Sequence, residues 1–296
     1  MTAQFASITE ADVAAERERF PRMFSASAGE RVRFWLLWGG LAALTMYCLY
    51  RFGFFSGDFL HGVGKFGSVV IGQLFPPKGF EHLPEFTKVM GETIAMAFLG
   101  TLMGAIVAFP LSFFASKNMT RARPVQFGTR RFADLLRSFD YLIWALIFVR
   151  AIGLGPLAGI MAIAIVETGT FIKLYSEAIE NLDRKQSDGI TAAGGSGLQR
   201  IRFGVLPQVL PMMLSNTLYM FEHNVRSASI LGIVGAGGIG FLLADRLRAY
   251  ELQEACTIII LIIVAVYAID YLSKFLRERL IGDHRRREPV DDAVQV

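Results

Sequence analysis

The stretch TIAMAFLGTLMGAIVAFPLSFFAS, Thr93–Ser116, runs for 24 residues without a charged side chain. At 1.5 Å per residue, a helix of this length extends about 36 Å, which is enough to cross the roughly 30 Å hydrocarbon core of a bilayer. Other uncharged stretches of 17 to 19 residues lie at Phe34–Tyr50, Phe203–Phe221 and Ser227–Ala244. The sequence therefore predicts an all-α membrane protein with several transmembrane helices.

The composition supports this class. Of the 296 residues, 53% are hydrophobic and 19% are charged, and the charges gather between the apolar runs. The net charge of +4 comes from basic residues beside those runs, where membrane topology places them, so we expect no nucleic-acid partner. Cys48 and Cys256 lie inside apolar runs and predict neither a disulfide nor a metal site. The mostly polar N-terminal tail predicts no cleavable signal peptide.

Basic clusters predict the orientation of the chain, because Lys and Arg beside short loops favour the cytoplasm. Such clusters occupy the N-terminal tail, the stretch after the second span, and the C-terminal tail. The segment Arg51–Glu92 instead balances four basic residues against four acidic ones, which suits the outside. We therefore expect a multi-pass membrane protein with both termini in the cytoplasm.

The parity of crossings then gives about six spans. GLGP, Gly153–Pro156, is a turn signal that splits the apolar run Tyr141–Val166 into a hairpin. One full helix follows at about Leu206–Ser229, and Cys256–Phe275 is the last span. The expected parts are a cytoplasmic tail (1–33), a first span (34–52), an extracytoplasmic segment with an interfacial helix (53–87), a transmembrane domain (88–276) with a cytoplasmic loop (183–207), and a second tail (277–296).

Two amphipathic helices are expected outside the spans. Apolar residues recur at helical spacing before the second span and predict a helix on the outer membrane surface, with the members Phe59, Val63, Phe66, Val70 and Leu74. In the N-terminal tail, Ser7 and Glu10 have the spacing of a capping box and predict a short cytoplasmic helix.

The motif GAGGIG, Gly235–Gly240, has the G-x-G-x-x-G spacing of a dinucleotide-binding turn. No strand–helix–strand unit surrounds it, so we expect no nucleotide there. Irregular backbone at membrane depth requires cover from protein or a water-filled cavity. The sequence predicts a partly inserted turn near the outer face that lines or adjoins a gate, built on Gly235, Gly237, Gly238 and Gly240.

Signals for catalysis are weak. The four histidines include no pair at metal-ligand spacing, so we expect no metal site and no catalytic residue. GGSG, Gly194–Gly197, matches a motif of intramembrane serine proteases, but Ser196 lies in a charged loop far in depth from His223. GTLMG (Gly100–Gly104) and GPLAG (Gly155–Gly159) have the small-xxx-small spacing of helix packing.

Charged residues inside a predicted span are expensive and normally face a partner, water or the bundle interior. FEHNVR places Glu222, His223 and Arg226 within the span that begins near Leu206. Residues three and four apart share a helix face, so Arg226 is expected to meet both Glu222 and His223. Two interpretations remain open: an internal Glu222–Arg226 ion pair, or a pathway site where Arg226 and His223 attract an oxyanion.

The segment DGITAAGGSGLQRIRFGVLP, Asp188–Pro207, is longer and more patterned than a simple connection requires, which indicates docking to a partner. It resembles the EAA loop of ABC-importer permeases, in which E-A-A-x-x-x-G is followed by nine residues and I-x-L-P. Gly194 falls on the signature glycine and Leu206-Pro207 on the closing pair. Asp188, Gly189 and Ile190 depart from the usual Glu-Ala-Ala.

About residues 60–280 are similar to the permease of phosphonate importers, through ETIAMAFLGTLMGAIVAFPLSFFASKN, ALIFVRAIGLGPLAGIMAIAI, LYSEAIENLD and FEHNVRSASILGIVGAGGIG. The resemblance implies the type I ABC importer permease fold, with the loop as a cytoplasmic coupling helix, in the plasma (inner) membrane of a bacterium. It also implies two permease subunits (a homodimer or paralogues), two ATPase subunits and an extracytoplasmic phosphonate-binding protein. This chain would bind no cofactor, because ATP and Mg belong to the ATPase.

The predicted function is the membrane pathway for phosphonates, with phosphate or phosphite as further substrates. Importers of methionine or other oxyanions share the glycine-rich turn and remain alternatives. A secondary transporter also has broken helices but does not require the Asp188–Pro207 loop. A structural membrane anchor fits poorly with ionisable residues inside spans.

Overall fold

The computed structural model describes residues 28–55, 57–120 and 122–285. The expected N-terminal helix with Ser7 and Glu10 lies outside these residues. The chain divides into two units, residues 1–72 and 73–296. The first unit contains α3 (Ala28–Arg51) and α4 (Gly57–Ser68), and a π-helical segment (Val69–Leu74) runs on from α4 across the division. A helix was expected here, and its position on the membrane surface remains a prediction.

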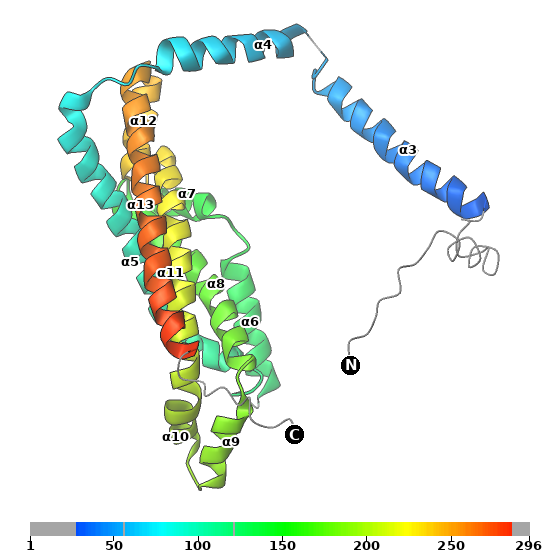
Figure 1. Ribbon diagram of the computed structural model, residues 1–296, viewed down its shortest axis with the longest axis vertical. Coiled ribbons are helices and arrows are strands. Elements are labelled where there is room, and N and C mark those ends of the chain that lie inside the picture. The colour runs from blue at the N-terminus through cyan, green and yellow to red at the C-terminus, as the bar shows by residue number, and fades with distance from the viewer. Residues whose placement is uncertain (1–27, 56, 121, 286–296) are drawn as a thin grey trace, which may run out of the picture. The chain divides into compact units, whose positions relative to one another are not determined.

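The second unit is a bundle of helices (Figure 1). Its long members are α5 (Leu83–Ala115), α8 (Pro156–Glu180), α11 (Leu206–Leu231) and α13 (Leu252–Arg285). Shorter helices connect them: α6 (Arg123–Leu136), α7 (Tyr141–Ile152), α9 (Arg184–Ala192), α10 (Gly197–Gln199) and α12 (Ile239–Arg248). Every described element is helical or irregular, as the apolar runs predict.

The closest helix pair is α5 and α8, and glycines permit the approach. A Cβ on Gly100 would lie 2.7 Å from Cβ of Ile163, and one on Gly104 would lie 2.7 Å from Cβ of Glu167. Gly159 on α8 lies in the same way against Met96 of α5. GTLMG therefore acts in helix packing, as expected, because a side chain at Gly100 or Gly104 would separate the two helices. Of GPLAG only Gly159 packs in this way, since Gly155 precedes α8 and has open space around it.

The crossing that precedes α8 is divided between α6 and α7. Arg130 of α6 pairs with Glu180 at the end of α8, and Ala133 of α6 packs against Gly169. Further along, the hydroxyl of Tyr141, the first residue of α7, donates to Glu167 over 2.7 Å. The two short helices thus run antiparallel to α8 and together match its length. The first half of this crossing, α6, contains several charged residues. No uncharged stretch in the sequence therefore revealed the crossing.

The number of spans follows from these lengths. In the described residues, four helices are long and apolar enough to cross a membrane, and α11 with α12 forms a fifth, bent by 44°. One of the six expected spans starts at Tyr141, the first residue of α7. The 12 residues of α7 cover only about 18 Å, so this span also needs the preceding helix α6 to cross the membrane. The last helix is also longer than expected, because α13 continues through 277–285, which we expected to be a tail.

The orientation leads to a labelling prediction. In a variant with Cys48 and Cys256 replaced, a cysteine at Gln199 should react only with reagent on the cytoplasmic side, and one at His82 only from outside. Both side chains are exposed, and the basic clusters place Gln199 inside. Labelling of intact cells and inverted vesicles with an impermeant maleimide measures this. Reaction of both cysteines from one side would contradict the topology.

Candidate functional site

The expected coupling loop begins with a capped helix, α9. The side chain of Asp183 accepts from the backbone N–H of Lys185 and caps the helix at its start. At its end, the N–H of Gly195 donates to the carbonyl of Ile190 over 2.9 Å, and that of Gly194 to Thr191 over 3.0 Å. This pair of bonds is a Schellman motif, which ends a helix and reverses the chain.

Gly194 occupies the left-handed position of that motif, with φ of +79°. A Cβ added there would meet nothing within 4 Å, so the backbone conformation, and not a steric contact, selects glycine. The signature glycine of the predicted coupling loop therefore lies where the chain reverses. Its role in coupling to an ATPase remains a prediction.

The returning arm of the loop, the segment from Ser196 to Val205 that leads back to α11, is also held in place by side chains. Ser196 and Gln199 form a reciprocal capping box that starts α10, so the motif GGSG has a structural explanation. A π-helical turn (Arg200–Val205) follows, and Gly204 within it packs against Ile190 and Ser187 of α9. Ile190, one of the departures from the family pattern, thereby fills the space between the two arms.

The remaining residues of the predicted loop lie at its surface and its base. Asp188 and Arg200 border a 280 Å³ cavity between the loop and the ends of α5 and α8. Gly189 is exposed on α9, and Leu206-Pro207 begins α11. The apolar side chains of Leu198 and Phe203 are 76% and 60% exposed, so the loop presents an apolar surface that fits contact with a partner.

The second group of predicted residues, on α11, belongs to a charge network. Arg226 donates to the carboxylate of Glu222 over 2.9 Å, as expected from their spacing. The other carboxylate oxygen of Glu222 accepts from Arg277 of α13 over 3.1 Å. Arg226 also approaches Asp270 of α13 at 3.5 Å. The chain of pairs Asp270–Arg226–Glu222–Arg277 is neutral as a whole.

Asp270 and Arg277 were not predicted as members of this network from the sequence. Asp270 interrupts the apolar run that forms the last span, and that interruption was a signal for an intramembrane partner. Arg277 was assigned to the tail, although a residue one turn beyond a span can reach into it. Arg226 keeps 49% of its side chain exposed, whereas Glu222 keeps 13%, so the guanidinium is the member of the network best placed to meet another molecule.

The expected meeting of His223 with Arg226 remains a prediction, and the ring of His223 has a recorded neighbour on another helix. That ring is 6.3 Å from the ring of Tyr141 on α7, and the histidine side chain is exposed. His223 and Arg226 therefore belong to the same exposed part of α11, but the interaction that the structure records for the histidine ring is with α7.

The glycine-rich turn joins the bent pair α11 and α12. Gly235, Gly237 and Gly238 have φ of +92°, +79° and +73°, and Gly240 lies too close to the carbonyl of Ser229 to carry a side chain. The turn is held from both sides, because Gly155 donates to the carbonyl of Gly235, and Thr93 of α5 accepts from the N–H of Ile239. It is a packed junction between two helices, whereas a dinucleotide-binding turn joins a strand to a helix.

A buried polar cluster below this turn joins four helices. Glu167 of α8 is fully buried and accepts from Tyr141 of α7. Asn224 of α11, also fully buried, donates to Thr101 of α5 over 2.9 Å and lies close to the Glu167 carboxyl. The sequence analysis did not single out Glu167, although it directly follows the apolar run. In the residues that the structure describes, no group of three or more His, Cys, Asp or Glu has the geometry of a metal site.

Residues 100–283 match the protein family described as binding-protein-dependent transport system inner membrane component. The chain belongs to this family. Membership makes it an inner-membrane permease subunit of an ABC importer and not an enzyme, since the ATPase partner of such importers hydrolyses ATP.

Three relatives narrow the subfamily to permeases for phosphite, phosphate or phosphonate. HtxC of Stutzerimonas stutzeri, provisionally named a phosphite transport permease, is 36% identical over 224 residues, 76% of this chain and 79% of HtxC. The phosphate-import permease PhnE of Mycolicibacterium smegmatis is 36% identical over 217 residues, 73% of this chain and 41% of PhnE. PhnE2 of Escherichia coli K12, provisionally assigned to a cryptic phosphonate system, is 46% identical over 121 residues, 41% of this chain and 99% of PhnE2.

Solved structures agree on the fold. The inward-facing methionine transporter MetNI matches with a TM-score of 0.60 at 19% identity, covering 69% of this chain and 99% of the matched chain. A bacterial alginate importer matches with a TM-score of 0.56 at 15% identity, covering 90% and 98%. The expected all-α type I importer permease fold is confirmed.

Proposed function

We propose that this chain forms the membrane pathway for phosphonates, with phosphite and phosphate as further substrates, delivered by an extracytoplasmic binding protein. The observation that carries the proposal is the difference in similarity among relatives. Those named for phosphite and phosphate transport are 36% identical over about three quarters of the chain, whereas a D-methionine permease of Vibrio cholerae is 23% identical.

The proposed assembly has two permease subunits, two ATPase subunits and the binding protein. In it, α9 and the Gly194 turn dock on the ATPase, and the exposed Leu198 and Phe203 lie at that contact. Two features support this arrangement: the loop is ordered by caps at both ends, and its apolar side chains face outward. A secondary transporter has no need for such a loop.

We further propose that Arg226 contributes to the pathway. A guanidinium offers a planar pair of donors to an oxyanion such as a phosphonate. Its partial engagement with Glu222 and Asp270 would limit affinity and allow release. The half-exposed side chain supports this role, since a purely internal ion pair would be covered by the bundle.

Uptake by the reconstituted importer tests the substrate assignment. Proteoliposomes that contain the permease and its ATPase, with the binding protein added outside and ATP inside, should accumulate methylphosphonate. Methionine, presented in the same assay with a methionine-binding protein as control, should not be accumulated. Uptake of methylphosphonate that persists without the ATPase, driven by a proton or sodium gradient, would contradict the proposal.

A further inference from the structure

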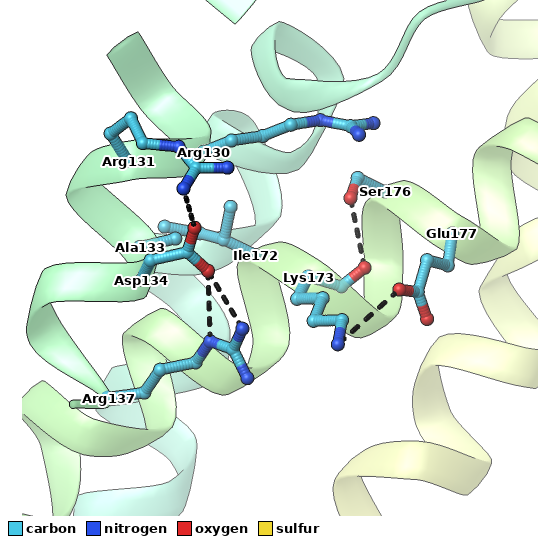
Figure 2. Close-up of a pocket in the computed structure, with 9 residues that line it drawn as sticks. All are labelled: Arg130, Arg131, Ala133, Asp134, Arg137, Ile172, Lys173, Ser176 and Glu177. Carbon is cyan, nitrogen blue, oxygen red and sulfur yellow. Dashed lines mark hydrogen bonds and ion pairs between the residues drawn. The ribbon is translucent and has the colours of Figure 1, made fainter. Parts of the chain in front are cut away.

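A basic cavity of 250 Å³ lies between α6 and α8, away from the coupling loop and the charge network. Figure 2 shows Asp134 and Arg137 of α6 on one wall and Lys173 and Glu177 of α8 on the other. With Arg130 and Arg131, four basic side chains and two acidic ones border the space. The cavity therefore carries an excess of positive charge.

Part of this charge is already engaged. Arg130 donates to the carbonyl of Ala115 and pairs with Glu180. Asp134 accepts from Arg137 over 2.8 Å and pairs with Arg131 at 3.2 Å. Lys173 pairs with Glu177 at 3.9 Å, the limit of an ion pair, and its side chain is 49% exposed. Asp134 across the cavity also interacts with the Lys173 charge. Lys173 and the shared guanidinium groups are thus available to an anion.

The cavity lies near the end of a membrane-spanning helix. The 25 residues of α8 extend about 37 Å, roughly 7 Å more than the hydrocarbon core. Glu177 lies in the last turn of α8 and Lys173 about 10 Å before the end of the helix, within reach of the lipid headgroups for a long basic side chain. Long basic side chains extend readily to that layer.

An exposed apolar stripe on α6 indicates what kind of anion fits. Phe127 and Leu135 lie one turn before and one turn after Arg131 on the same face of α6, and they are 64% and 59% exposed. The helix therefore places charged groups at the cavity and apolar groups beside it. A free phosphate would use only the charges, whereas a phospholipid would use both.

We propose that this cavity binds the headgroup of an anionic glycerophospholipid, whose acyl chains lie along the apolar stripe of α6. The volume holds about eight waters at roughly 30 Å³ each, which is enough for a phosphodiester. Basic pockets between membrane helices at the headgroup level recognise lipids in this way. This lipid would lie where α6 packs against the end of α8, at the membrane surface.

Native mass spectrometry of the purified full-length permease tests the site, with phosphatidylglycerol and phosphatidylcholine as probes. We expect the wild type to retain phosphatidylglycerol in preference to phosphatidylcholine. Lys173→Gln should weaken phosphatidylglycerol binding about fivefold, the effect of one basic residue at an anionic surface. Lys173→Arg should retain binding, and so should Lys274→Gln, a control that removes an exposed basic residue from α13.

Two outcomes would overturn the proposal. One is equal retention of phosphatidylglycerol by the wild type and Lys173→Gln. The other is saturable binding of inorganic phosphate without anionic lipid that disappears in Lys173→Gln, because this would assign the cavity to a free anion. Since Lys173 is half exposed and weakly paired, its replacement does not endanger folding, and the amount of monodisperse protein provides the check.

Discussion

Replacement of Gly194 by valine is expected to lower ATP-driven uptake at least about tenfold while the permease still enters the membrane. The left-handed conformation costs an L-residue roughly 1–2 kcal/mol, and a β-branched side chain more. A penalty of 1.4 kcal/mol already depopulates the native turn about tenfold. Because the turn sets the angle between α9 and the returning arm, its loss would misplace the helix that docks on the ATPase. Uptake in proteoliposomes and the amount of ATPase that co-purifies measure the effect.

Two neighbouring substitutions separate conformation from size. Gly194→Asn should retain most uptake, since asparagine visits the left-handed region readily. Gly197→Ala should be close to wild type, because Gly197 has open space around it and no positive φ. If Gly194→Val transports as well as Gly197→Ala, the loop does not couple the ATPase to the pathway.

For the charge network, the double variant Arg226→Met/Asp270→Asn is expected to assemble like the wild type and to lose more than about nine tenths of its uptake. Removing Arg226 alone leaves Asp270 without its recorded partner, whereas Glu222 keeps Arg277. A lone carboxylate in a span costs about 2.5–3.5 kcal/mol, so the single variant should assemble poorly. Asp270→Asn removes that charge and should restore assembly.

The recovery of transport then decides between the two interpretations of Arg226. If the double variant assembles and imports normally, the network only neutralises itself and Arg226 has no direct role with substrate. Arg226→Lys keeps the charge but not the planar fork, and intermediate uptake is expected. Lys274→Met, which removes a 70% exposed charge from the same end of α13, should leave both assembly and uptake unchanged.

Features that arise from short-range sequence patterns were predictable. The glycine of the coupling loop, the Leu206-Pro207 start of α11 and the i,i+4 pair Glu222–Arg226 depend on residues close together in the chain. Their geometry follows from helix spacing and from the backbone freedom of glycine. The small-xxx-small motifs likewise indicated close packing, although the sequence alone did not show that Gly100 faces Ile163.

Contacts between distant segments were not predictable from a single sequence. Arg226 and Asp270 are 44 positions apart, and no periodicity relates their two helices. The division of one crossing into α6 and α7 was hidden for another reason. Half of that crossing is charged and amphipathic, so a search for continuous apolar runs finds only the 12 residues of α7.

The buried carboxyl of Glu167 has a consequence for how the chain is made. As α8 leaves the ribosome, its central acid faces lipid at a cost of about 2.5–3.5 kcal/mol unless a hydrogen-bonding neighbour is present. Tyr141 is synthesised earlier, but Asn224 emerges 57 residues later than Glu167. Glu167 therefore depends on Tyr141 of α7 at first, and Asn224 becomes a second polar neighbour only when α11 is inserted. A nascent chain that ends between these helices would carry an incompletely satisfied acid, a state that membrane quality-control proteases can recognise.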